Sequence, residues 1–165
     1  MSSILSLSDL SSYCEDISFA SALSFPELTQ YFDSLFATGC RASELSKLVN
    51  WSDNGSTGFN FQPLKRNNIR FIPYSSLSSS LVAKFQDNNF LFPVLTGEYI
   101  DRWFRFFRAF PIFTCSKEVS ASAFRYRFIK NLHFSGLSDT EIMVITGHKK
   151  AVIVQGYYNA VIYRN

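Results

Sequence analysis

TGHKKAVIVQGYYN, residues 146–159, places one histidine and two tyrosines in a short segment near the end of a 165-residue chain. His148 follows a glycine, and Tyr157 and Tyr158 come nine and ten residues after it. The apolar residues from Val152 onward recur at helical spacing, which predicts a helix over residues 152–162. An imidazole would then lie just before a helix that carries a phenol.

Three strings upstream each carry a cationic side chain that is a candidate for chemistry. They are ATGCRASEL with Arg41 (residues 37–45), LKRNNIRFIP with Lys65 (residues 64–73) and VSASAFRYRF with Arg125 (residues 119–128). Any one of these strings occurs widely by chance. The opening string and these three, in one order and on suitable elements, together indicate a common functional site.

Local patterns predict a mainly α fold with a small antiparallel β-sheet, an α+β class. Helical spacing, Ser caps and Gly stops predict helices at residues 25–37, 42–48, 79–85, 97–110, 121–134, 138–146 and 152–162. The second of these is expected to end at Asn50 and Trp51, and Ser138 with Glu141 forms a capping box. Two aromatic and β-branched runs, 59–63 and 69–73, flank a polar turn and predict a hairpin.

Length and composition fit one globular domain. A chain of 165 residues is long enough for a sizeable core, and 47% apolar with 17% aromatic residues argues against disorder. Residues 24–165 are expected to form the domain, and the Ser-rich segment 1–23 either a leader or a first helix. A net charge of +3 allows a polyanionic partner without requiring one.

The cysteines and the absence of long apolar runs argue against several classes of protein. Three cysteines, Cys14, Cys40 and Cys115, are an odd number without CxxC spacing, which argues against a disulfide framework or a zinc site and favours buried thiols. Neither a signal peptide nor an apolar run of ~20 residues is present, so we expect an intracellular protein without a membrane span.

The four strings together resemble the signature of the tyrosine recombinase, or phage integrase, family over roughly residues 24–158. ATGCRASEL is similar to the family's TGxRxSEL box, and VSASAFRYRF to its VTPHDLRHTF box. The resemblance implies the tyrosine recombinase catalytic fold, a DNA breaking-rejoining enzyme. It also implies that Arg41 and Arg125 are the two catalytic arginines and that Glu44 holds Arg41 in place.

The remaining two strings supply the other catalytic candidates. Lys65 stands eight residues before Pro73, the spacing of the family's hairpin lysine. TGHKKAVIVQGYYN is similar to LGHxxxxxxxxY, which implies that His148 contacts the phosphate and that Tyr157 is the nucleophile, with Tyr158 a near second.

The chemistry explains why these residue types belong together. A phosphodiester under attack gains negative charge on its nonbridging oxygens, which planar guanidiniums fit bidentately. The resemblance implies that Tyr157 attacks phosphorus and leaves a 3′-phosphotyrosyl link, so that rejoining needs no ATP. A lysine whose pKa falls on enclosure can protonate the departing 5′ oxygen. The scheme needs no metal and no cofactor.

Ser122 is the main departure, because the family has histidine there. A general acid or base contributes about 10²- to 10⁴-fold in rate, so we expect a slower enzyme with the arginine clamp intact. Three alternatives stay open: a DNA-binding regulator of the same fold, a telomere resolvase, and an enzyme of the type IB topoisomerase kind. Plainer interpretations also exist for single residues: Arg41 as a helix-end charge, Arg125 as a plain phosphate contact, His148 as a helix cap and Lys65 as part of a basic turn.

The expected partner is double-stranded DNA, in site-specific recombination or integration by a mobile element or virus. The predicted DNA contacts beyond the catalytic residues are basic side chains: Arg66, Arg70, Arg127, Lys149 and Lys150. The resemblance implies a homo-tetramer on DNA, and we expect a monomer otherwise. The family's separate N-terminal core-binding domain is expected to be absent from this chain.

Overall fold

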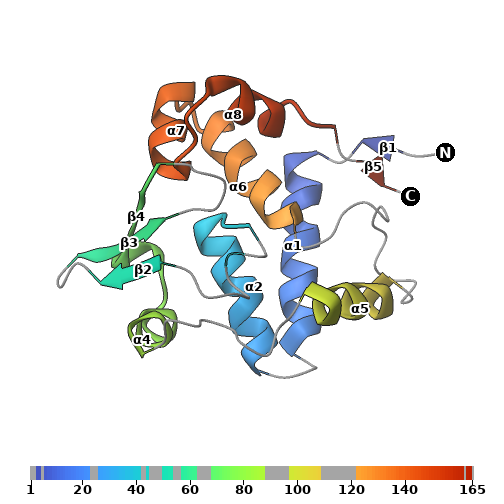
Figure 1. The fold of residues 1–165 in the computed structure, drawn as a ribbon. Helices are drawn as coiled ribbons and strands as arrows, with labels where there is room; N and C mark the ends of the chain where they lie inside the picture. Colours follow the sequence, from blue (N-terminus) through green and yellow to red (C-terminus); the bar gives the residue numbers. More distant parts are fainter. Residues whose placement is uncertain are drawn as a thin grey trace.

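The computed structural model describes residues 3–4, 6–22, 26–41, 44, 50–53, 57–62, 68–87, 97–108, 122–161 and 163–164 (Figure 1). The helices in these ranges are α1 (Leu7–Ala22), α2 (Pro26–Thr38), α4 (Ser79–Asp87), α5 (Gly97–Arg108), α6 (Ser122–Phe134), α7 (Asp139–Thr146) and α8 (Ala151–Tyr158), with a 3₁₀ turn at Tyr74–Ser76. The strands are β1 (Ser3–Ile4), β2 (Asn50–Asp53), β3 (Gly58–Gln62), β4 (Arg70–Pro73) and β5 (Tyr163–Arg164). The predicted α+β class is confirmed.

The small sheet has the order β2-β3-β4, with both pairs antiparallel. The predicted hairpin is confirmed, since Phe59 pairs with Ile72 and Asn60 with Phe71. The prediction that a helix ends at Asn50 and Trp51 is wrong, because both residues lie in β2 and pair with β3. Pairing with β3 satisfies the backbone groups of these residues, which a helix end would have left without partners inside the helix. The rest of the predicted 42–48 helix falls largely outside the described residues.

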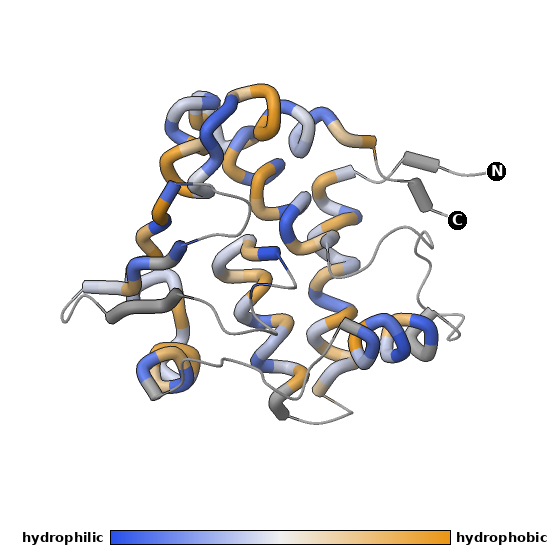
Figure 2. The backbone as a smooth tube through the Cα atoms, viewed as in Figure 1, coloured by the Kyte–Doolittle hydropathy of each residue, from blue (hydrophilic) through white to orange (hydrophobic). Residues whose placement is uncertain are grey.

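The Ser-rich start of the chain contributes to the core rather than forming a loose leader. In α1, Leu10, Cys14 and Ile17 are each at most 1% exposed. This helix packs against α2 and α6 (Figure 1). Figure 2 shows orange and blue segments alternating along α2 and α6, as expected for helices with one buried face. The first-helix alternative therefore holds for Leu7–Ala22.

Aromatic side chains dominate the larger of two hydrophobic clusters, which we call the aromatic cluster. Phe32 lies at its centre, stacked on Phe124 with ring centroids 5.5 Å apart, and it also contacts Trp103 and Phe104. These rings come from α2, α5 and α6. The cluster thus joins the N-terminal helices to the helix that carries Arg125.

The second cluster is small and joins α6, α7 and α8. Its fully buried residues are Ile129, Ile142 and Val154, one from each helix. We call it the aliphatic cluster. Partly buried side chains, Tyr157 among them, pack on its edge.

Helix ends set the geometry of this C-terminal region. The predicted capping box opens α7, because Ser138 Oγ accepts from the Glu141 amide and Glu141 Oε1 accepts from the Ser138 amide, both at 3.2 Å. Gly147 closes α7 with φ of 80°, a left-handed conformation that favours glycine. The helix predicted for 152–162 ends earlier, at Tyr158. There Lys130 Nζ donates to the carbonyls of Tyr158 and Ala160 at 3.0 and 2.6 Å, a cation placed where a helix end is electronegative.

The described thiols, Cys14 and Cys40, are buried and free, as predicted, and Cys115 lies outside the described residues. Within the described ranges, no helix is long and apolar enough to span a membrane.

Candidate active site

Arg125 is the centre of the site, and each of its guanidinium nitrogens has a partner. The side chain is 4% exposed and comes from the first turn of α6. Nε donates to the Tyr157 hydroxyl at 2.9 Å, Nη1 to the Gly39 carbonyl at 2.8 Å, and Nη2 lies 2.8 Å from His148 Nε2. One guanidinium therefore joins three segments that are far apart in sequence.

His148 is held in a single tautomer by its two neighbours. Thr146 Oγ1 donates to the Ile142 carbonyl at 2.9 Å and lies 2.7 Å from His148 Nδ1. Its proton is used in the first contact, so it accepts the proton of Nδ1 in the second. Arginine has donors only, so Nε2 accepts from Arg125 and carries no proton.

The electrostatic surroundings keep this imidazole neutral. The side chain is 2% exposed. Burial, followed by the charges of Arg125, Arg41 and Arg70, lowers the pKa of His148 from 6.5 to about 4. Burial is also the largest cause that lowers the pKa of Arg125. His148 is therefore neutral near pH 7, in agreement with the hydrogen bonds.

Arg41 and Glu44 form the ion pair that the sequence predicts. Arg41 Nη1 lies 3.2 Å from Glu44 Oε1, with Arg41 19% exposed and Glu44 1% exposed. Glu44 Oε2 is buried without a hydrogen-bond partner in the part of the chain that the structure describes. Arg41 follows the turn at Gly39, whose carbonyl binds Arg125, so the two arginines lie on either side of one short turn.

Gly39 permits the close approach of α2 and α6 at this turn. Its φ is 64°, in the left-handed region. A Cβ built there would overlap the ring and Cβ of Phe128. A side chain at position 39 would therefore push apart the segments that carry Arg41 and Arg125.

The two candidate nucleophiles lie in different surroundings. Tyr157 has its hydroxyl on Arg125, and its ring lies 5.1 Å from Tyr126 and 5.8 Å from His148. Tyr158 stacks flat on His133, with centroids 3.7 Å apart. The phenol next to the arginine and the imidazole is that of Tyr157.

The structure shows less about the other predicted site residues, Lys65, Arg66 and Ser122. Lys65 and Arg66 lie outside the described residues. The Asn68 amide, two residues before β4, donates to the Gly147 carbonyl at 2.7 Å, which ties the connection between β3 and β4 to the turn before His148. Ser122 is exposed and lies one turn before Arg125 on α6.

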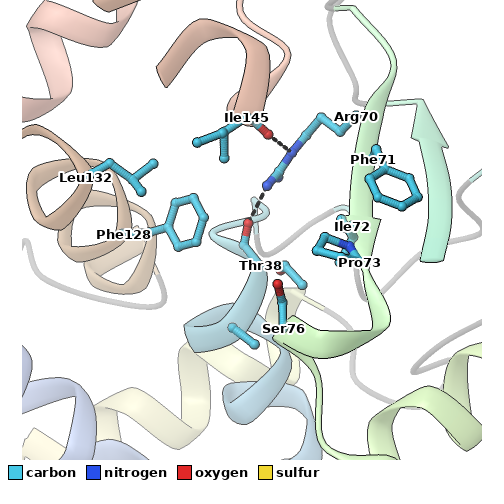
Figure 3. Close-up of a pocket in the computed structure, with 10 residues that line it drawn as sticks. Thr38, Arg70, Phe71, Ile72, Pro73, Ser76, Phe128, Leu132 and Ile145 are labelled. Carbon is cyan, nitrogen blue, oxygen red and sulfur yellow. Dashed lines mark hydrogen bonds between the residues drawn. The ribbon is translucent and has the colours of Figure 1, made fainter. Parts of the chain in front are cut away.

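Among the predicted DNA contacts, Arg70 requires a correction. Arg70 is 2% exposed and donates from Nε to the Ile145 carbonyl and from Nη2 to the Thr38 carbonyl (Figure 3). A guanidinium bound in this way inside the protein does not face DNA. Arg127 lies over the ring of Phe36, 3.9 Å from its centroid, and its DNA contact stays a prediction, as do those of the exposed Lys149 and Lys150.

Sequence reasoning missed Thr146 and Tyr126. Thr146 selects the tautomer of His148, and the signal was its place two residues before that histidine, where its hydroxyl reaches the ring. Tyr126 packs on the Tyr157 ring, and no local pattern distinguishes it from the other aromatics of this chain.

Among the described residues of the site, cations outnumber anions. Arg41, Arg70 and Arg125 lower the pKa of His148 through their charges, and among the described residues Glu44 is the carboxylate that pairs with Arg41. The described residues contain no group of three His, Cys, Asp or Glu side chains that could hold a metal ion. The arrangement suits an anion that accepts several hydrogen bonds.

Comparison with known proteins gives matches at the level of structure. No protein-family model matches the chain, and no curated protein matches it in sequence. XerA recombinase superposes with a TM-score of 0.65 at 21% identity, over 90% of this chain and 58% of that one. XerH site-specific recombinase bound to difH substrate gives 0.63 at 14% identity, over 94% and 49%. The Tn1549 transposon integrase in complex with circular intermediate DNA gives 0.60 at 20% identity, over 93% and 60%.

The chain thus spans about half to three fifths of the length of these solved structures. The agreement extends over nine tenths of its own length. The protein has the fold of the tyrosine recombinase catalytic domain.

Proposed function

We propose that this chain is the catalytic domain of a site-specific DNA recombinase or integrase that cuts and rejoins strands through a 3′-phosphotyrosyl link at Tyr157. One observation carries the proposal: the Tyr157 hydroxyl and His148 Nε2 bind neighbouring nitrogens of the Arg125 guanidinium. The proposed nucleophile and a proton acceptor thus both contact the cation that would bind the phosphate.

The charge balance supports phosphate as the group that binds. Among the described residues, the charges of three arginines act on His148 and Glu44 pairs with one of them, Arg41, which leaves excess positive charge at low exposure. Guanidiniums bind phosphate oxygens bidentately, and in a water-poor site the interaction strengthens as charge develops on phosphorus. A phosphodiester in its pentacoordinate state meets that requirement.

The protonation state of His148 supports an order of proton transfers. The phenol oxygen of Tyr157 bonds to phosphorus as the bond from phosphorus to the 5′ oxygen breaks. The phenol proton passes to His148 Nε2, which carries none before DNA binds. The negative charge of the bound phosphate offsets the arginine charges that disfavour the imidazolium, and the imidazolium then donates to a phosphate oxygen. Lys65 supplies the proton to the departing 5′ oxygen. Rejoining runs the same steps in reverse.

Ser122 and the exposed basic residues complete the proposal. An exposed serine one turn before Arg125 replaces the family's histidine, so the expected reaction is slow. Lys149 and Lys150, exposed beside His148, and Arg66 would contact the DNA backbone. The partner is double-stranded DNA, with four copies of the chain assembling on it. XerH and the Tn1549 integrase were solved in complexes with DNA.

A nicked suicide substrate tests the proposal. The chain is incubated with a pool of nicked duplexes of randomised sequence, and covalent adducts are separated on denaturing gels. We expect adduct with the wild type and with Tyr158→Phe, and none with Tyr157→Phe. The Tyr158 variant is a matched control, because it removes the same atom from the next residue along the chain.

Two results separate this proposal from its main competitor. DNA binding without adduct in any variant would favour a DNA-binding regulator of the same fold. Adduct that persists in Tyr157→Phe and disappears in Tyr158→Phe would reject the assigned nucleophile.

A further inference from the structure

Two helices end at the same buried guanidinium. Arg70 Nη2 donates to the carbonyl of Thr38, the last residue of α2, at 2.6 Å. Its Nε donates to the carbonyl of Ile145, next to the last residue of α7, at 2.7 Å. Nη1 lies 3.6 Å from Cys40 Sγ. Figure 3 shows the side chain reaching from β4 to both helix ends.

Among the described residues, both carbonyl partners of Arg70 belong to helix ends. The last carbonyls of a helix have no partner within the helix and carry partial negative charge. Two such ends converge on Arg70, which is 2% exposed. Hydrogen bonds to both helix ends offset the free-energy cost of burying the Arg70 guanidinium.

Catalytic candidates emerge from each of these helix ends. After Thr38 the chain passes Gly39, whose carbonyl binds Arg125, and reaches Arg41. After Ile145 it passes Thr146, which binds His148 Nδ1, and reaches His148 itself. The distance between the two turns therefore depends on what holds the two helix ends together.

We propose that Arg70 is a positioning residue that fixes the Arg41 turn and the His148 turn relative to each other for the phosphate reaction. The expected effect of Arg70 on cleavage rests on the proposed function. Its effect on the position of the two turns rests only on its hydrogen bonds to the helix ends. Arg70 touches neither phosphate nor nucleophile in this role. It acts through Thr38 and Ile145.

Arg70→Lys is the decisive variant. Lysine keeps the positive charge and concentrates its donors on one atom, so it does not reproduce the planar fork that reaches both carbonyls. Arg102→Lys is the matched control, because Arg102 is 66% exposed and pairs with Glu98 on α5. Leu81→Ala, in the buried face of α4, provides a destabilised variant away from both turns.

Hydrogen exchange measures the structural consequence without any need for activity. We expect faster exchange in residues 35–41 and in residues 142–148 of Arg70→Lys, with α1 and α5 unchanged. Neither Arg102→Lys nor Leu81→Ala should produce this paired change. Exchange that rises in only one of the two segments, or in neither, overturns the proposal. Arg70→Gln, which is uncharged and smaller, replaces the lysine variant if that one does not fold.

Single-turnover cleavage measures the catalytic consequence. A misplacement of about 1 Å can cost roughly 10²-fold in rate, and we expect a loss of that order in Arg70→Lys with DNA affinity little changed. The loss should be equal for a substrate with a 5′ bridging oxygen and one with a 5′ bridging sulfur, whose thiolate departs without a proton donor. Cleavage at the wild-type rate, or a loss restored by sulfur, overturns the proposal, since the second result would mean that Arg70 acts through the proton donor.

The two proposals fail in different ways. If the wild type forms no adduct while both segments exchange faster in Arg70→Lys, the recombinase proposal fails and the positioning role stands. If the wild type forms adduct and Arg70→Lys matches it in rate and in exchange, the positioning role fails and the recombinase proposal stands.

Discussion

The aromatic cluster and the aliphatic cluster differ in depth, and the candidate site lies between them. Phe124 on α6 belongs to the first and Ile129, just over one turn later, to the second. Arg125 lies between the two, whereas Tyr157 packs on the edge of the second. Regions with few buried apolar contacts open at lower free energy than a deep core. We therefore expect the segment that carries Tyr157, the proposed nucleophile, to open more easily than the part of α6 that carries Phe124.

The largest effect should come from removing the centre of the aromatic cluster. Phe32→Ala deletes a fully buried ring that contacts Phe124, Trp103 and Phe104. We expect a loss of about 3–5 kcal/mol in the free energy of unfolding, measured by urea denaturation. A loss below about 1 kcal/mol would show that the cluster does not dominate stability.

His148 makes the stability of the protein depend on pH. Its pKa is lowered from 6.5 to about 4, chiefly by burial, so below pH 6.5 the unfolded chain takes up a proton that the folded chain does not. The contribution of the neutral imidazole to the free energy of unfolding is fully present above pH 6.5. It is lost as the pH falls toward 4, by at most about 3 kcal/mol. Denaturation of the wild type and of His148→Gln across this range isolates it. Parallel curves for the two proteins would contradict the assigned neutral imidazole.

Gly39→Ala should separate the two arginine-bearing segments. The substitution meets both a left-handed φ and the side chain of Phe128, which together should cost about 1–3 kcal/mol and slow adduct formation. Gly136→Ala is the matched control, because its φ of 94° is also left-handed and no atom lies within 4 Å of the added Cβ. Equal effects of the two variants on adduct formation would mean that backbone strain alone, and not the Phe128 contact, matters.

Removing one methyl group from each cluster should show which cluster affects the reaction. Ile142→Val and Ile100→Val each remove one methyl group from a buried isoleucine, the first in the aliphatic cluster and the second in the aromatic one. Both should cost about 0.5–1.5 kcal/mol. Only Ile142→Val should change the rate of adduct formation, because Tyr157 packs on that cluster. A slower rate in both would remove the distinction.

The smallest expected effect is a gain. Gly156 lies within α8, beside Tyr157, and a Cβ there meets no atom within 4 Å. Alanine should stabilise the helix by about 0.5–1 kcal/mol and slow hydrogen exchange in α8. Unchanged exchange would indicate that α8 is already held as firmly as the helices of the aromatic cluster.

Much of the fold was predictable because its signals are local. The capping box at Ser138, the stop at Gly147 and the hairpin runs each specify backbone hydrogen bonds within a few residues. The first helix was harder, since its Ser-rich sequence has a loose apolar rhythm, and burial of Leu10, Cys14 and Ile17 against α2 and α6 stabilises it. Tertiary packing outweighed weak propensity there.

Motifs predicted which residues form the candidate site, but they did not predict how these residues contact one another. Arg41, Glu44, Arg125, His148 and Tyr157 were identified from motifs, and their contacts through Gly39 and Thr146 depend on how helices meet. Arg70 was misassigned because it lies in a basic run. The signal was its alternation with Ile72 along β4, since residues two apart on a strand share a face and Ile72 is buried.

Mapping the point of covalent attachment tests the central claim most directly. After reaction of the wild type with the nicked pool, nuclease trimming and trypsin leave the peptide of residues 151–164, which contains Tyr157, Tyr158 and Tyr163. Fragmentation mass spectrometry then assigns the residual nucleotide to one residue. We predict a 3′-phosphonucleotide on Tyr157. Attachment to Tyr158 or Tyr163, or a peptide that is never modified while DNA is bound, would contradict the account.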